Sequence, residues 1–457
     1  MNVLQAIKRK LKEKYDAIDN RKFKENLLNA LPFWVGAFAT GVVAVGYAKL
    51  FAFAESGTAY LFHRASWLFF LVTPACFLLA WWVVKQYAPY SRGSGIPQVS
   101  AALELSNPKH SYNVSVLLSL RVAIVKIISS LIMVFGGGVV GREGPTIQIS
   151  ASIFKQINDW LPAWYPKISK RNMIVTGAAA GLASAFNTPL GGIVFAIEEL
   201  TKTHFSFFKS ALLTGVIIAG LTALTFLGPY LYLGYPPLDR IPPSIILLIL
   251  PVAFFAGIVG SSMGTILLFV FKKKASLKKE YQKYLYAIVC GLIVAMLGVL
   301  ISSKTFGSGK EIMVATLFTN DKHLDWYIPL LRMIGPIVSF SNGAAGGIFA
   351  PALSLGASIG AVLAGWMHLS VTETNLIILC GMTGCLTGVT RSPFTCSILV
   401  LEMTNSHNII FYIMLTALCA NLVSNMVGRH SFYDSLKDQY IREIHKAEAQ
   451  LSKPNLD

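Results

Sequence analysis

Apolar stretches recur along the chain from about residue 31 to residue 427, and they come in two lengths. Residues 31–53 and 245–267 are long enough to cross a bilayer, which takes about 20 consecutive apolar residues in a helix. Shorter stretches bounded by Gly or Pro lie at 146–158, 173–186, 190–200 and 392–403. Helix ends at membrane depth are tolerated only against protein or beside a water-filled pathway. The pattern therefore predicts an all-α polytopic membrane protein whose broken helices line a pathway.

The composition supports a membrane protein and shows where the charge lies. Apolar residues make up 54% of the 457 and charged residues 13%, which is too few to cover a soluble surface. The net charge of +17 is concentrated in residues 1–28 and 272–283. Basic flanks of this kind are cytoplasmic by the positive-inside rule. Neither run carries a recognition fold, so we expect no nucleic-acid partner.

The residues that usually carry enzyme or metal chemistry do not form a pattern here. The six cysteines lie in apolar segments without CxxC spacing, and the eight histidines form no HExxH. There is no phosphate loop and no nucleophile–base pair. We therefore expect no metal, no cofactor and no enzymatic activity.

An internal repeat organises the chain. Three pairs of motifs recur in the same order at offsets of 204 to 214 residues. They are GSG at 93–95 and 307–309, GREGP at 141–145 with GIFAP at 347–351, and a Gly–Pro–Glu spacing at 177, 189 and 198 and again at 381, 393 and 402. We predict a basic N-terminal segment at 1–29, membrane repeats at 30–235 and 236–430, and a C-terminal helix with a short cytoplasmic tail at 431–457.

The basic flanks indicate how the two halves are oriented. In the first half the basic run precedes the apolar segment 31–53, whereas in the second half the cluster at 272–283 follows the equivalent segment 245–267. The halves are therefore predicted to be inverted in the membrane. Transporters with inverted repeats place the substrate site near the midplane, at the repeat interface, on interrupted helices.

The three glycine motifs share one physical design. In GSGIP at 93–97, GREGP and GIFAP, glycines let the backbone turn, and Pro fits the first turn of a following helix. Each motif thus presents a helix N-terminus with unpaired N–H groups and a partial positive charge. Several such ends that converge would hold an anion without a lysine or arginine, and the anion would be free to leave.

GSGIP, GREGP and GIFAP, in this order and spacing, resemble the signature of the CLC family of chloride channels and transporters over about residues 30–445. The resemblance implies an inverted-repeat fold of tilted helices of uneven length, a homodimer, and one ion pathway per subunit. It also implies that chloride is bound by the hydroxyls of Ser94 and Tyr433, the backbone amides of Ile348 and Phe349, the backbone at Arg142, and the position of Glu143.

Glu143 is an acidic residue in a glycine-rich break at membrane depth, where a carboxylate is costly enough to indicate a function. The resemblance implies that it is the gate and the external proton site. Deprotonated, it would occupy an anion position, and protonated, it would swing out and admit chloride. The alternative from the residues alone is an ion pair with Arg142 or Lys126.

Glu198 and Glu199 end the apolar run 189–197, and the repeat treats them differently. Glu198 pairs with Glu402, whereas Glu199 pairs with Met403. A carboxylate present in both halves is expected to bond at an equivalent helix end. The resemblance implies that Glu199 is the internal proton glutamate of an antiporter, and the alternative is a solvated helix end.

We therefore expect a secondary active transporter that exchanges chloride for protons, with a passive chloride channel of the same fold as the alternative. Ser94 favours chloride over nitrate or fluoride by the same resemblance. The sequence departs from the family pattern at Gln98, where the first motif usually continues with Glu. The expected location is the inner membrane of a prokaryotic cell, with both termini cytoplasmic.

Overall fold

The computed structural model describes residues 21–451 apart from 107–110, 202–208, 229–230, 239–240, 320–321 and 429. These described residues form α-helices joined by short 3-10 and π-helical turns, and they contain no strand. Seven helical segments among them are long and apolar enough to cross a membrane. The predicted all-α polytopic class is therefore confirmed. Residues 1–20 and 452–457 lie outside the described part, and the four domain boundaries stay predictions.

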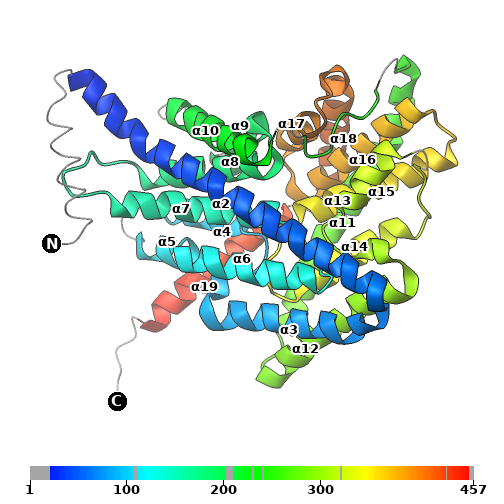
Figure 1. The fold of residues 1–457 in the computed structure, drawn as a ribbon, viewed down its shortest axis with the longest axis horizontal. Helices are drawn as coiled ribbons and strands as arrows, with labels where there is room; N and C mark the ends of the chain where they lie inside the picture. The colour runs from blue at the N-terminus through cyan, green and yellow to red at the C-terminus, as the bar shows by residue number, and fades with distance from the viewer. Residues whose placement is uncertain are drawn as a thin grey trace.

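The helices follow one another in two series of similar order (Figure 1). The first series is α2 (Arg21–Ala65), α3 (Phe69–Tyr87), α4 (Ile96–Glu104), α5 (Ser111–Leu117), α6 (Leu120–Phe135), α7 (Glu143–Trp160), α8 (Lys170–Phe186), α9 (Pro189–Phe195) and α10 (Lys209–Leu227). The second is α11 (Ile246–Lys274), α12 (Glu280–Met296), α13 (Lys310–Phe318), α14 (Ile328–Ser341), α15 (Phe349–Trp366), α16 (Val371–Thr390), α17 (Pro393–Thr404) and α18 (Ile410–Val427), and α19 (Phe432–Leu451) follows it.

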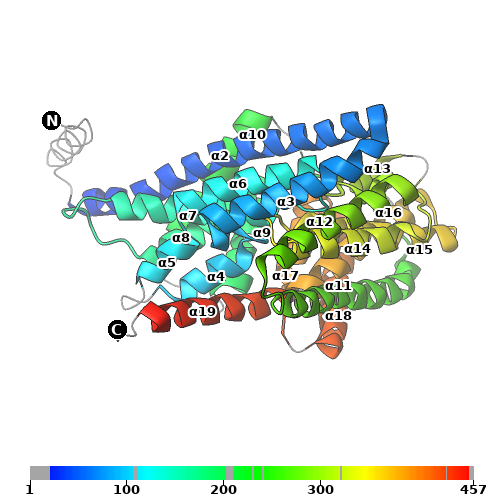
Figure 2. The ribbon, with the colours of Figure 1, turned by 90° about the horizontal axis from the view of Figure 1, so that it is seen from below.

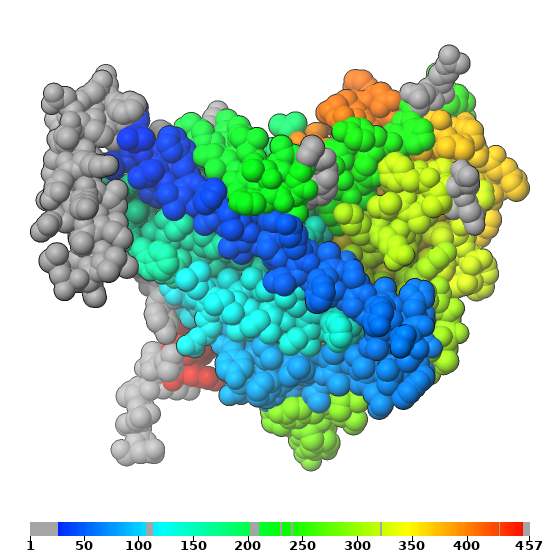
Figure 3. Space-filling view, viewed as in Figure 1, coloured from blue at the N-terminus to red at the C-terminus, as the bar shows by residue number. Residues whose placement is uncertain are grey.

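Helix α2 is longer than the apolar stretch that predicts it. It runs for 45 residues, because the polar residues on both sides of 31–53 continue the helix. It crosses the surface diagonally between α10 and α6 (Figure 3), and its outer side chains include the exposed Phe38 and Phe53. An apolar outer surface of this kind suits contact with lipid.

The broken helices occur in equivalent pairs. Helices α4 and α13 have nine residues each, α9 has seven and α17 has twelve, so none of them spans a bilayer. Both α4 and α13 begin after a glycine in the left-handed region, Gly95 at φ 109° and Gly309 at φ 88°. A Cβ atom at Gly309 would lie 1.9 Å from the Arg332 guanidinium, so this turn requires glycine for space as well as for conformation.

The two series are related by a pseudo-twofold axis that passes between Gly141 and Gly347. These glycines are repeat partners, and each donates its N–H to the carbonyl of the other, at 2.8 and 2.6 Å, in an antiparallel bridge. Two equivalent residues can exchange hydrogen bonds in this way only where the axis relating the halves passes between them. The predicted inverted repeat is therefore confirmed at its centre.

Two carboxylates bond across the same axis. Glu198 accepts hydrogen bonds from Phe394 N at 3.1 Å and Thr395 N at 2.6 Å, at the start of α17. Its partner Glu402 accepts from the first N–H groups of α9, at 3.1 and 2.6 Å. Each half thus supplies the cap for a short helix of the other half, which is the structural role expected of this pair.

Two buried cations brace the GSG turns. Lys126 Nζ donates to Gly93 O at 2.8 Å, and Arg332 Nη1 donates to Thr305 O at 3.0 Å and Gly307 O at 3.3 Å. Both side chains are fully buried, and they are repeat partners at an offset of 206 residues. A buried charge needs hydrogen-bond acceptors. The bonds from Lys126 and Arg332 in turn fix the backbone carbonyls that precede α4 and α13.

The last helix returns to the first half of the chain. Helix α19 lies beside α4 and α5 (Figure 2). Lys437 forms an ion pair with Glu104 at 3.0 Å, and Asn113 donates to Glu448 at 2.6 Å. The second series therefore ends by placing Tyr433, at the start of α19, next to elements of the first.

Candidate functional site

The N-termini of α7 and α15 meet at the pseudo-twofold axis. Each helix follows one of the two bridged glycines, and each has Pro in its first turn, where the missing N–H is not needed. Ser94, just before α4, reaches the same place, because a Cβ atom on Gly144 would lie 2.2 Å from Ser94 Oγ. Three helix starts thus converge on one region, as the glycine motifs predict, and the region is favourable for an anion.

Two buried hydroxyl groups face this region. Ser94 and Tyr433 are each 1% exposed, and neither hydroxyl has a partner with the geometry of a hydrogen bond in the described part of the chain. The two hydroxyls are neighbours, and the Tyr433 ring lies 6.1 Å from that of Phe349. Buried hydroxyls normally have a partner, so a pair of them without one is suited to donate to an exchangeable anion.

The Glu143 carboxylate folds back toward the axis. The side chain is 1% exposed, and its Oε1 accepts a hydrogen bond from the Tyr232 hydroxyl at 3.0 Å. Its Oε2 lies 2.4 Å from the position that a Cβ atom on Gly141 would take, and that position is 3.4 Å from Ala350 N in the first turn of α15. The carboxylate thus lies beside the helix starts, where an anion would also lie.

The alternative interpretation of Glu143 as half of an ion pair is wrong for the described residues. Lys126 donates to Gly93 O instead, and Arg142 forms no ion pair with Glu143 in the described part. The carboxylate is buried with one oxygen that has no hydrogen-bond partner among the described residues. A buried carboxylate with an unbonded oxygen is energetically costly. The cost is acceptable for a side chain that moves away or takes up a proton during function.

Glu199 lies on a π-helical turn, Ala196–Thr201, that directly extends α9. It is 8% exposed, and Ser392 Oγ donates to its Oε2 at 2.6 Å, so it is not a solvated helix end. A packing gap beside it, too small to hold a water molecule, is also lined by Phe349 and Tyr433. The structure therefore places Glu199 close to two of the predicted anion-binding residues.

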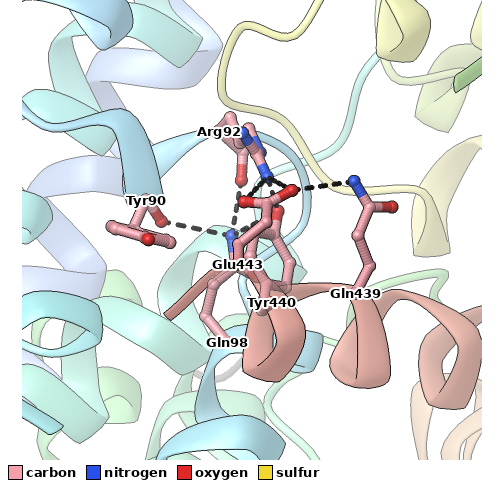
Figure 4. A network of polar contacts seen from close by, with 6 residues as sticks. All are labelled: Tyr90, Arg92, Gln98, Gln439, Tyr440 and Glu443. Carbon is pink, nitrogen blue, oxygen red and sulfur yellow. Dashed lines mark hydrogen bonds and ion pairs between the residues drawn. The ribbon is translucent and has the colours of Figure 1, made fainter. Parts of the chain in front are cut away.

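A polar network connects the two hydroxyl-bearing segments (Figure 4). Arg92, two residues before Ser94, donates to both Glu443 oxygens, at 2.8 and 2.6 Å, and its guanidinium lies 4.9 Å from the Tyr440 ring centroid. Burial opposes the charge of Arg92, but Tyr440 and Glu443 outweigh it and raise the pKa of the guanidinium. The ion pair links the segment before α4 to the helix that carries Tyr433.

The same network explains the departure at Gln98. Its amide Nε2 donates to Arg92 O at 2.6 Å, to Tyr90 O at 3.2 Å and to the Tyr440 hydroxyl at 3.2 Å. A carboxylate has no proton to donate to these backbone carbonyls. Gln98 therefore supports the GSG turn by bonds that a Glu in its ionised form does not make.

Sequence reasoning misses two residues at this site, Tyr232 and Lys310. Tyr232 lies in the connection between the two series, which has no repeat partner, so the repeat gives no signal for it. Lys310 Nζ lies 4.5 Å from the Tyr232 ring centroid. Its repeat partner is Ile96, and a lysine at the start of a short apolar helix is a signal that the sequence does contain.

Comparison with known proteins gives a consistent result. Residues 76–425 match the family described as voltage gated chloride channel. The H(+)/Cl(-) exchange transporter ClcA of Salmonella arizonae is 29% identical over 440 residues, covering 91% of this chain and 89% of that protein, and the Salmonella typhimurium protein of the same name is 29% identical over 437. Among solved structures, a slow cyanobacterial Cl-/H+ antiporter matches 91% of this chain and 98% of its own with a TM-score of 0.78 at 24% identity. A CLC-type fluoride/proton antiporter matches the same shares with a TM-score of 0.75 at 21% identity.

Proposed function

Because the chain belongs to the voltage-gated chloride channel (CLC) family, we propose that it is a secondary active transporter that exchanges chloride for protons across a membrane. The observation that carries the proposal is a pair of buried carboxylates, Glu143 beside the converging helix starts and Glu199 close to Tyr433. A passive channel needs only the first of them. The names of the ClcA relatives support exchange as well.

Chloride is held by donors that carry no full charge. The hydroxyls of Ser94 and Tyr433 and the backbone amides of Ile348 and Phe349 would donate to it, aided by the helix dipoles that converge there. A lysine in contact would hold the ion too tightly for turnover. Lys126 and Arg332, the buried cations that brace the GSG turns, are bonded to backbone carbonyls instead.

Glu143 competes with chloride for one position. As a carboxylate it occupies the outer anion position, near the backbone at Arg142 and the start of α15. When it takes a proton from the external solution, it loses its charge and its attraction to the helix starts, and it leaves the position to chloride. When it releases the proton toward the interior and returns, chloride is displaced, so proton and chloride move in opposite directions.

Glu199 provides the second proton site, on the internal side. Its carboxylate accepts a hydrogen bond from Ser392 and lies close to Phe349 and Tyr433. A proton that passes between Glu143 and the cytoplasm would bind transiently to this carboxylate. No cofactor takes part, because the two carboxylates and the anion donors account for the exchange.

The transporter would work as a homodimer in the inner membrane of a bacterial cell, with both termini cytoplasmic. The proposed orientation follows the basic flanks, since positive loops face the cytoplasm. The bacterial origin of the ClcA relatives supports the location. The proposed dimer surface is formed by α10 and α18, which carry exposed apolar side chains.

The deciding experiment uses purified protein in liposomes with an outward chloride gradient and a valinomycin potassium clamp. We expect the wild type to drive protons inward against their gradient. Wild-type chloride flux without any uphill proton movement would favour the channel instead.

The same assay tests the internal site. Glu199→Gln keeps the shape of the side chain and removes its titration, so we expect chloride efflux to persist while chloride-driven proton uptake falls to background. Glu198→Gln is the matched control, because Glu198 caps α17 and is not proposed to carry protons. If Glu199→Gln still pumps protons, another residue holds the internal site.

A further inference from the structure

The Tyr232 hydroxyl makes a direct contact with the gate. It donates to Glu143 Oε1 at 3.0 Å, and the tyrosine is 3% exposed. The groups that act electrostatically on Glu143 from the surrounding elements are Arg142, Glu55 on α2, Lys310 on α13, and the tyrosines Tyr47, Tyr232 and Tyr433. Among the described residues, Tyr232 is the one of these that forms a hydrogen bond with the carboxylate.

The connection that carries Tyr232 is fixed to the second series. Leu233 N donates to Met403 O at 3.1 Å, at the end of α17. Further along, Asn408 donates to Leu238 O at 2.9 Å. The Tyr232 ring itself packs edge-on against Phe186, with ring centroids 4.9 Å apart. The hydroxyl is therefore held in place and does not follow Glu143 when the carboxylate moves.

Lys310 lies over the face of the Tyr232 ring. Its ammonium is 4.5 Å from the Tyr232 ring centroid, within the range of a cation–π interaction. A cation over the ring withdraws electron density from the phenol and makes its O–H a stronger donor. Lys310 also lines a cavity of about 470 Å³ together with Glu55, so it lies between this cavity and the gate.

We propose that Tyr232 is a positioning residue that holds the Glu143 carboxylate in the anion pathway, and that Lys310 strengthens its hydroxyl as a donor. The proposal rests on the gating role of Glu143 given above. A hydrogen bond to an ionised acceptor is roughly twice as strong as one to a neutral acceptor. Tyr232 therefore favours the docked, deprotonated gate over the protonated one, and it sets the pH at which the gate opens.

The first test compares the pH dependence of chloride flux in liposomes. Tyr232→Phe keeps the ring and the cation contact and removes only the hydroxyl. Without this bond the docked carboxylate is less favoured, so protonation and opening occur at higher pH. We expect the midpoint of the flux profile to move by about one pH unit toward alkaline values.

Tyr286→Phe is the matched control. Tyr286 also has a lysine over its ring, Lys274 at 5.2 Å, and it also donates its hydroxyl to a neighbour, Ser341 Oγ at 2.8 Å, but it does not touch Glu143. It should leave the midpoint unchanged. An equal shift in both variants would mean that losing any such hydroxyl has this effect, and it would overturn the proposal.

The second test measures chloride binding by calorimetry and needs no transport. Because the docked carboxylate competes with chloride, Tyr232→Phe should bind chloride roughly threefold to tenfold more tightly than the wild type at neutral pH. In a Glu143→Gln background the same change should have no effect. Equal affinities of Tyr232→Phe and wild type would overturn the proposal, whether or not the protein exchanges protons.

A double-mutant cycle tests the part played by Lys310. Lys310→Met keeps the length of the side chain and removes its charge, and it should shift the flux midpoint in the same direction by a smaller amount. If Lys310 acts through the Tyr232 hydroxyl, the double variant should resemble Tyr232→Phe alone. Fully additive shifts would show that Lys310 acts on the gate directly, and they would remove it from the proposal.

Discussion

At the scale of single residues, the site depends on buried polar atoms that form no hydrogen bond within the described part of the chain. The Ser94 and Tyr433 hydroxyls and Glu143 Oε2 are buried without a hydrogen-bond partner among the described residues. By contrast, the buried Lys126 ammonium beside the same turn is bonded to Gly93 O. Each of the three unbonded atoms lies where an ion is proposed to pass, so each can be tested by substitution.

Replacing Glu143 with Gln removes the charge that competes with chloride and nearly keeps the size of the side chain. Chloride flux should persist, and its pH dependence and all coupled proton movement should be lost. Parallel recordings of chloride and proton flux in liposomes check this. An unchanged proton flux would remove Glu143 from the gate.

Replacing Ser94 with Pro removes both the hydroxyl and the backbone N–H next to the anion. We expect nitrate flux to rise relative to chloride flux. Ser94→Ala removes the hydroxyl alone and should weaken chloride binding by about tenfold, the effect of losing one hydrogen bond to an ion. If the flux ratio of Ser94→Pro equals the wild-type ratio, Ser94 does not line the site.

Sequence reasoning identifies the residues that belong to a repeated or glycine-marked motif, such as Ser94, Glu143 and the Glu198–Glu402 pair. It misses Tyr232, because the chain that carries it occurs once and its distance from Glu143 is set by tertiary bonds at Leu233 and Phe186. A contact between residues 89 positions apart leaves no periodic signal along the chain.

At the scale of elements, α19 acts as a support for the site. Its first turn carries Tyr433, and its later turns hold Arg92 and Gln98 on the segment that carries Ser94. The hydrophobic pattern does not predict this role, since α19 is polar and follows the second repeat. Conversely, the apolar stretch 31–53 does predict α2. The helix continues beyond this stretch to Ala65, through residues whose hydrophobic pattern does not predict a membrane helix.

A substitution far from the anion site can weaken the bonds between α19 and the segment that carries Ser94. Glu443→Gln removes the charge that binds Arg92, so α19 should hold Tyr433 less firmly. We expect chloride affinity to fall by roughly twofold to fivefold in calorimetry, as suits the loss of a half-exposed ion pair. Lys437→Gln breaks the other α19 ion pair, to Glu104, and should leave the affinity unchanged. Equal losses in both variants would mean that α19 merely stabilises the fold.

At the scale of the whole molecule, the exposed apolar side chains are not all equivalent. Ile217 on α10 is 47% exposed and Leu422 on α18 is 68% exposed, on the helices that are repeat partners at the proposed dimer surface. Leu50 on α2 is 51% exposed but lies on the surface assigned to lipid. The two surfaces look alike in composition and differ in what is proposed to cover them.

The prediction is that Trp at both Ile217 and Leu422 yields monomers, because two large side chains prevent close packing of the dimer surface. Leu50→Trp should leave the dimer intact. Light scattering on detergent-purified protein, with crosslinking in membranes, measures the outcome. A dimer that persists in the double variant would exclude this surface without affecting the fold.

The exchange of caps between the halves bears on how such a chain could arise and be divided. Glu198 closes a helix that starts at Pro393, and Glu402 closes one that starts at Pro189, so either half alone would leave a helix start exposed. A single copy of this unit would satisfy its helix start only by pairing with a second copy about a twofold axis, because the exchange of caps is reciprocal. The two segments, produced as separate fragments in the same cell, should still recognise each other through these interlocked carboxylates.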